Sequence, residues 1–351
     1  PLKALMGAGL ALEAGGTAMM AFAFGPAWLY FCALFQGAGA GICGMVTAAA
    51  LISSWFYDNH GTRLSIAFAA GAAGAALLSP VLGFCLSSFG WRLTYVIQAG
   101  LAALLLLPCL VLPVEAFPER LGQVPSGTLR PEKEACAARF PKVFSQTVLI
   151  CVLAALLVGI PQHFGNYALS IGLDLQAGAS MLAWAMTGNV VFKLAAAAAG
   201  RFCEPPAALL GLCAVSAAGL AGLLISMAFP NRTAVLLPAF LAGSIYGLAD
   251  LSAPLLIEYY FGRKKYVRLY AALNFAEVMM SAVSISLAGW MYDLALNYVW
   301  ILSAALTVCA IIALLLYLMR RKNRIPESWR ESASRLKSAF DSKKKAPDPA
   351  E

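Results

Sequence analysis

Three ionisable residues lie inside long apolar stretches of the sequence: Lys193, Asp250 and Glu277. A charged side chain at the centre of a membrane-spanning helix costs about 2.5–3.5 kcal/mol, so each of the three is a candidate for function. A lysine close to two carboxylates can neutralise one of them. The other carboxylate then has no cationic partner, and a group of that kind can take up and release a proton.

Their positions along the chain indicate a common depth. Each of the three lies eight or nine residues from a charged residue at the inner end of its own apolar stretch. At 1.5 Å per helical residue, this places all three roughly 12–14 Å from the inner face of a membrane. An alternative to a buried role exists for Lys193, because its long side chain could extend the ammonium toward the headgroups. The carboxylates have shorter stems, which favours a cavity or a partner. A fourth ionisable residue of the apolar stretches, Glu13, is interpreted as structural.

A second polar group lies in the stretch "GIPQHFGNY" from Gly159 to Tyr167, where Pro161 can open a helix. Interrupted helices are common at the binding sites of transporters. The alternative is that these side chains lie among headgroups at the outer end of the span. The candidates here are Gln162, His163, Asn166 and Tyr167, with Gln36 and Tyr246 as weaker candidates elsewhere.

The elements that must position these residues are membrane helices. The chain of 351 residues is 61% hydrophobic and only 12% charged, against roughly 25% charged in an average soluble domain. Apolar stretches of about 20 residues, long enough to cross a bilayer, follow one another along the chain. We therefore expect an all-α polytopic membrane protein with ten spans, at about 4–23, 27–53, 64–87, 93–113, 143–165, 176–199, 207–228, 234–257, 269–290 and 298–319.

The basic residues predict the orientation. When Lys and Arg are assigned to alternate sides of these spans, 22 of the 25 fall on one side. Arg92 and Arg232 fall on the other side, and Lys193 lies within a span. By the positive-inside rule the first side is cytoplasmic, so both ends of this chain are expected to face the cytoplasm, most simply across a plasma membrane.

The chain also contains an internal repeat. The segment "WFYDNHGTRLSIA" at Trp55–Ala67 is matched about 205 positions later by "YYFGRKKYVRLYAA", which begins at Tyr259. Two spans precede the first copy, whereas four separate the polar segment near 114–142 from the second copy. This difference predicts two further helices upstream of Pro1 and a parallel duplication of six spans, a linker and six spans.

These repeated turns, with "GWR" at Gly90–Arg92 and "AGWMYD" at Ala288–Asp293, resemble the major facilitator superfamily. Within it, the oxalate/formate and monocarboxylate porter branch is the most similar. The resemblance implies two helical bundles, of which ten of the usual twelve helices are present here. It divides the chain into an N-terminal bundle (1–113, helices three to six), a cytoplasmic linker (114–142), a C-terminal bundle (143–320, helices seven to twelve) and a basic cytoplasmic tail (321–351).

The resemblance also implies a cytoplasmic gate at the basic turns. The segment "GRFCE" at Gly200–Glu204 is similar to the family's loop motif, with an acid that could meet the positive end of a helix near Arg63. The alternative is that the basic turns only fix orientation and that the acid is an ordinary solvated side chain. The gate candidates are Arg63, Glu204, Arg263 and Arg268.

The sequence argues against several other classes. Only two histidines are present, His60 and His163, on opposite sides of the predicted membrane, so a His-based catalytic triad or metal site is not expected. The nine cysteines form no CxxC pair, and the net charge of +8 comes from loops and tail and not from a nucleic-acid-binding face. We expect no catalytic residues, no cofactor, no metal and no nucleic-acid partner.

The sequence thus predicts a secondary active transporter and not an enzyme. It would move a small solute through the bilayer by alternating access, as a symporter or antiporter, with a proton as a possible coupled ion. Lys193 would suit an organic anion such as a monocarboxylate, whereas the two acids would suit a cation or a proton-coupled neutral solute. The alternative class is a receptor or scaffold with a transporter fold and no transport cycle.

Overall fold

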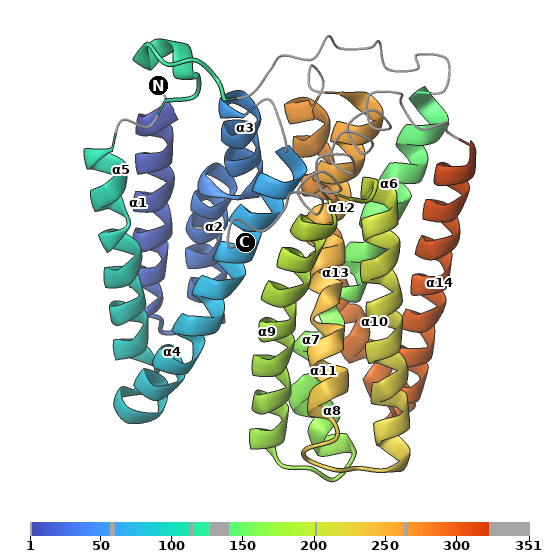
Figure 1. Ribbon diagram of the computed structural model, residues 1–351. Coiled ribbons are helices and arrows are strands. Elements are labelled where there is room, and N and C mark those ends of the chain that lie inside the picture. Colours follow the sequence, from blue (N-terminus) through green and yellow to red (C-terminus); the bar gives the residue numbers. More distant parts are fainter. Residues whose placement is uncertain are drawn as a thin grey trace, which may run out of the picture. The chain divides into compact units, whose positions relative to one another are not determined.

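A computed structural model describes residues 2–56, 60–112, 115–126, 140–200, 202–262 and 266–322. Within these ranges the regular structure is helical throughout, which confirms the all-α fold class (Figure 1). Arg263 and the tail from 323 to 351 lie outside the described residues.

Eight helical segments of the described residues are long and apolar enough to cross a membrane: Pro26–Trp55, Ser88–Val111, Pro141–Gln162, Gln176–Ala199, Pro205–Ala228, Leu236–Phe261, Tyr266–Ala295 and Val299–Arg321. The protein is therefore a multi-pass integral membrane protein. The predicted count of ten is approximate. The predicted span 64–87 corresponds to a shorter apolar helix, Thr62–Leu78, and the first predicted span corresponds to α1 (Leu2–Met20).

By their packing the residues fall into two compact units. The first contains Pro1–His60 and Ala73–Pro131, and the second contains Gly61–Ala72 and Glu132–Glu351. Each unit is described separately.

In the first unit, α1 packs along α2 (Pro26–Cys43) and also contacts α5 (Leu106–Val111). Small residues allow this approach, since a Cβ on Gly39 would lie 2.6 Å from the Glu13 nitrogen. After α2 come α3 (Met45–Trp55) and α4 (His60–Leu104), of which the part Gly61–Ala72 belongs to the second unit. The short 3₁₀ helix η1 (Pro118–Leu121) follows α5.

The helix α4 is interrupted at Gly90, within the "GWR" segment. Gly90 has φ of 76° and ψ of 171°, a conformation that an L-residue with a Cβ adopts only under strain. The glycine therefore interrupts α4 near the start of the span Ser88–Val111.

The second unit is a bundle built around α12. In chain order its helices are α6 (Phe140–Leu157), α7 (Gly159–Gln162), α8 (Phe164–Ser170), α9 (Leu175–Ala199), α10 (Pro205–Ala228), α11 (Leu236–Ala242), α12 (Ser244–Phe261), α13 (Tyr266–Ala295) and α14 (Val299–Lys322). The helix α12 contacts α6, α9, α10 and α13, and its span is the most buried of the eight (Figure 1).

Two spans of this bundle are interrupted, and serine hydroxyls bind the backbone at each break. Between α6 and α7, the Ser284 hydroxyl accepts from the Gly159 N–H (2.8 Å) and donates to the Leu156 carbonyl (2.6 Å). Between α11 and α12, the Ser244 hydroxyl donates to the Leu241 carbonyl (2.7 Å). Because lipid offers no hydrogen bonds, such side chains are what make a break in a membrane helix tolerable.

Candidate functional site

The site is positioned by close packing of α9 against α11 and α12. A Cβ on Gly243, between α11 and α12, would lie 2.8 Å from the backbone nitrogen of Asn189. One turn further along, a Cβ on Gly247 would lie 3.6 Å from Lys193 Cγ. The two helices therefore run in register, with four-residue steps on α9 facing four-residue steps on α12.

An ion pair within the membrane-spanning region joins α9 to α12 just after Gly247. Lys193 Nζ on α9 donates to Asp250 Oδ2 on α12 at 2.5 Å. The Lys193 side chain is 2% exposed and the Asp250 side chain 24% exposed. The ammonium is thus enclosed by protein, while one face of the carboxylate remains accessible.

Glu277 on α13 is within electrostatic range of this pair. It is buried, its Oε1 atom has no hydrogen-bond partner among the described residues, and its charge interacts with that of Asp250. Cys151, on α6, is an electrostatic neighbour of the Glu277 carboxyl. Lys193, Asp250 and Glu277 thus form a charged cluster of one cation and two carboxyl groups, in which Glu277 lies within electrostatic range of the ion pair.

Gln162 connects this cluster to the interrupted span α6–α8. Its Nε2 donates to the Tyr246 hydroxyl at 2.9 Å, and Tyr246 lies one turn before Asp250 on α12. Tyr246 is buried, whereas Gln162 is exposed in the described structure. Gln162, a candidate of the interrupted span, and Tyr246, one of the weaker candidates, are therefore hydrogen-bonded to each other one turn from Asp250.

The other candidates of the "GIPQHFGNY" stretch are placed differently. Nε2 of His163 lies 3.0 Å from the Ile285 carbonyl oxygen. Tyr167 is buried and donates to the Leu223 carbonyl at 2.6 Å. Asn166 is exposed. The Tyr167 hydroxyl thus has a backbone partner within the bundle.

Gln36 and Glu13 belong to the first unit. Gln36 Nε2, on α2, donates to the Thr17 hydroxyl on α1 at 2.7 Å, and Thr17 in turn donates to the Glu13 carbonyl at 2.8 Å. Gln36 therefore links two neighbouring helices.

Among the gate candidates, Glu204 precedes the first residue of α10 and lies 3.6 Å from Arg320 Nε, near the end of α14. Its described ion pair is thus within the second unit. Arg268 is exposed near the start of α13, and Arg63 lies on α4 with interacting neighbours.

Sequence reasoning missed one polar residue of the site, Asn189 on α9. It is buried, its Oδ1 has no hydrogen-bond partner, and it precedes Lys193 by one helical turn. The signal was present in the sequence as a polar residue four positions before an intramembrane lysine.

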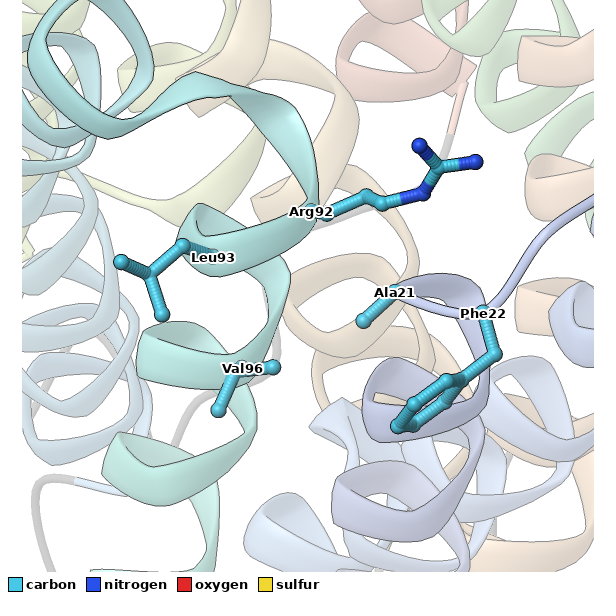
Figure 2. A pocket seen from close by; sticks show the side chains of 5 residues that line it. All are labelled: Ala21, Phe22, Arg92, Leu93 and Val96. Atoms are coloured by element: carbon cyan, nitrogen blue, oxygen red, sulfur yellow. The ribbon is translucent and has the colours of Figure 1, made fainter.

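A pocket of about 500 Å³ lies in the first unit, where the end of α1 meets α4 just after Gly90. Figure 2 shows Arg92 and Val96 on the side of their helix toward Ala21 and Phe22, and Leu93 pointing away from them; all five residues line the pocket. Arg92 Nη2 donates weakly to the Ala23 carbonyl at 3.5 Å, and its guanidinium lies 4.6 Å from the Trp91 ring centroid. The aromatic face and the carbonyl hold this cation at the end of the helix pair.

Eight apolar spans and an intramembrane cluster of ionisable side chains define a polytopic membrane protein of the transporter type. A family model described as the Major Facilitator Superfamily matches residues 1–284, and the chain belongs to that superfamily. No curated protein matches the chain in sequence.

Solved structures with a similar fold are also transporters. The E. coli fucose:proton symporter FucP, in a single-residue variant, has a TM-score of 0.63 at 16% identity, over 91% of this chain and 83% of that chain. FucP in an outward conformation gives 0.62 at 17% identity, over 92% and 83%. A bacterial homologue of the iron transporter ferroportin, in an outward-facing state, gives 0.64 at 12% identity, over 92% and 84%. At these identities the likeness is one of fold alone.

Proposed function

We propose that this protein is a secondary active transporter that carries a small organic anion together with a proton. The single observation that supports this proposal is the cluster of Lys193, Asp250 and Glu277 in the membrane-spanning part of the second unit. Membership of the superfamily supports the transport of a small solute. The fucose:proton symporter among the similar folds is compatible with coupling to a proton.

The charges in the cluster favour symport of one proton with one monovalent anion. With both carboxyl groups ionised, the three side chains carry a net charge of −1. A proton on Glu277 makes the cluster neutral, and an anion bound at Lys193 then restores −1. A proton therefore removes the repulsion that an incoming anion would meet from an ionised Glu277.

Asp250 would act as the internal competitor of the solute. In the described structure the Asp250 carboxylate is bound to the Lys193 ammonium. Asp250 is partly exposed, so it is the member of the pair that a solute can reach. A solute carboxylate that reaches the pair would replace one carboxylate with another around the same ammonium. This exchange keeps the buried charge paired at each stage, which avoids the cost of an isolated ammonium.

The orientation and the gate belong to the same proposal. The excess of Lys and Arg on one side supports a cytoplasmic position for the linker and the end of α14, at a plasma membrane. Arg63, Arg263, Arg268 and Glu204 are the proposed residues of a cytoplasmic gate. The substrate class is that of the oxalate/formate and monocarboxylate porters.

The test is Glu277→Gln in proteoliposomes, measured with labelled monocarboxylates of two to six carbons. An imposed proton gradient should no longer drive uptake in this variant, while exchange of labelled for unlabelled solute should persist, because a glutamine cannot release a proton. Glu13→Gln is the matched control, since it neutralises an acid of the first unit, and it should keep both activities. Gradient-driven uptake by Glu277→Gln would refute the coupling role. The absence of any exchange by the unaltered protein would favour a receptor that does not transport.

A further inference from the structure

Asn189 carries a buried hydrogen-bond acceptor that the protein itself does not use. The residue is 6% exposed, and its Oδ1 has no hydrogen-bond partner among the described residues. Buried polar atoms without a partner are uncommon in native proteins, and each one calls for an explanation such as a ligand or an ordered water. The Oδ1 atom can therefore accept a hydrogen bond from a bound solute or from an ordered water.

The position of Asn189 ties it to the charged cluster. The backbone nitrogen of Asn189 faces Gly243, between α11 and α12. Lys193 follows four residues later on α9, and its side chain packs against Gly247. Residues four apart on a helix lie on the same face, with their Cβ atoms about 5–6 Å apart. The α9 face therefore presents, side by side, one unused acceptor and one cation.

We infer that Asn189 is a specificity-determining residue, whose Oδ1 accepts a hydrogen bond from a hydroxyl group on the solute while Lys193 binds the carboxylate of that solute. This inference rests on the proposed function and narrows its substrate class to small hydroxycarboxylates. The hydroxyl must stand within a few bonds of the carboxylate, because the two protein groups are adjacent. A plain fatty acid of the same length would leave Oδ1 without a partner.

The expected selectivity follows from the cost of that unused acceptor. A site built to receive a hydroxyl rejects the analogue that lacks it, because the buried group is left without a hydrogen bond. For one neutral acceptor we expect roughly a 10- to 100-fold preference. If a water molecule took the place of the missing hydroxyl group, the two solutes would be preferred about equally.

The experiment compares 2-hydroxybutyrate with butyrate, which have the same length and charge and differ by one hydroxyl group. The apparent KM for proton-driven uptake of each is measured in proteoliposomes with the whole chain. The unaltered protein should prefer 2-hydroxybutyrate, and Asn189→Leu, which keeps the branched outline of the side chain but has no hydrogen-bonding atoms, should bring the ratio close to one. Thr187→Val is the matched control, because Thr187 is exposed on the same helix and bonded to its own backbone, at Ala183. It should leave the ratio unchanged.

A second readout excludes a purely structural role. If the acceptor is unused without solute, Asn189→Leu should leave the melting temperature of the solute-free protein unchanged or higher. In the unaltered protein, 2-hydroxybutyrate should also raise that temperature more than butyrate does. A lower melting temperature in Asn189→Leu, or an unchanged substrate ratio, would overturn this inference alone. Failure of the unaltered protein to transport either acid would overturn the proposed anion class as well.

Discussion

The ion pair between Lys193 and Asp250 allows a double-mutant cycle with an asymmetric outcome. The two groups are 2.5 Å apart, but Lys193 is 2% exposed and Asp250 is 24% exposed. Asp250→Asn therefore leaves a fully enclosed ammonium without its partner, whereas Lys193→Met leaves a carboxylate that still reaches solvent.

The magnitudes follow from this difference in burial. Removing one partner of a buried pair costs about 3–5 kcal/mol, and we expect Asp250→Asn to lie in that range. Lys193→Met should cost about 1–3 kcal/mol, because partial exposure reduces the penalty for the remaining carboxylate. The double variant has no unpaired charge from this pair and should be more stable than Asp250→Asn alone. The interaction energy in the cycle should therefore be about 2 kcal/mol or more.

The assay is reversible unfolding of each variant in mixed micelles of detergent and denaturing surfactant, followed by helical circular dichroism. The control cycle uses Glu204→Gln and Arg320→Met, in the same unit. That pair lies at 3.6 Å with Arg320 half exposed, so its interaction energy should stay below about 1 kcal/mol. Simple additivity of Lys193→Met and Asp250→Asn would refute the argument, because it would mean that the two side chains do not depend on each other.

Two further predictions concern glycines, each with a control glycine at which an added Cβ would meet open space. Gly188→Ala should destabilise the protein by about 1–3 kcal/mol, because the added Cβ would collide with the Phe240 carbonyl. Its control is Gly211→Ala in α10, where the added Cβ meets open space, and this variant should have an unchanged or higher melting temperature. Gly90→Ala should cost about 1–2 kcal/mol because of its φ of 76°, and Gly100→Ala should not; equal melting temperatures for the two α4 variants would contradict the interpretation of the break.

The sequence predicted the helical class and most spans because membrane helices have a local signature. A run of about 20 apolar residues identifies a span without knowledge of its neighbours. The signal weakened where length or polarity was marginal, as in α1 and in the stretch Thr62–Leu78. The interruptions were only partly visible. Pro161 marked the region of one break, whereas the break at Gly243 depends on serine contacts that become apparent only in three dimensions.

The site was harder to predict than the spans, because it depends on register between helices. Spacing along each helix indicates depth, so Lys193, Asp250 and Glu277 could be expected at one level of the membrane. It does not indicate which faces of different helices meet. For that reason the sequence could not show that the Tyr167 hydroxyl bonds to the Leu223 carbonyl, or that Asn189 is buried one turn before Lys193.

The glycines at the contact between α9 and α12 supply the register that the charges alone lack. Because Gly247 has no side chain, the aliphatic part of Lys193 packs against the α12 backbone at that residue. The Lys193 ammonium then reaches Asp250, three residues further along α12. At Gly243 the same absence of a side chain brings the α9 backbone close, and Asn189 is enclosed there. Small residues at this contact thus set both the distance of the ion pair and the enclosure of the unused acceptor. The polar groups of α9 are functional candidates because, among the described residues, Lys193 is paired with a partly exposed carboxylate and the Oδ1 of Asn189 has no hydrogen-bond partner.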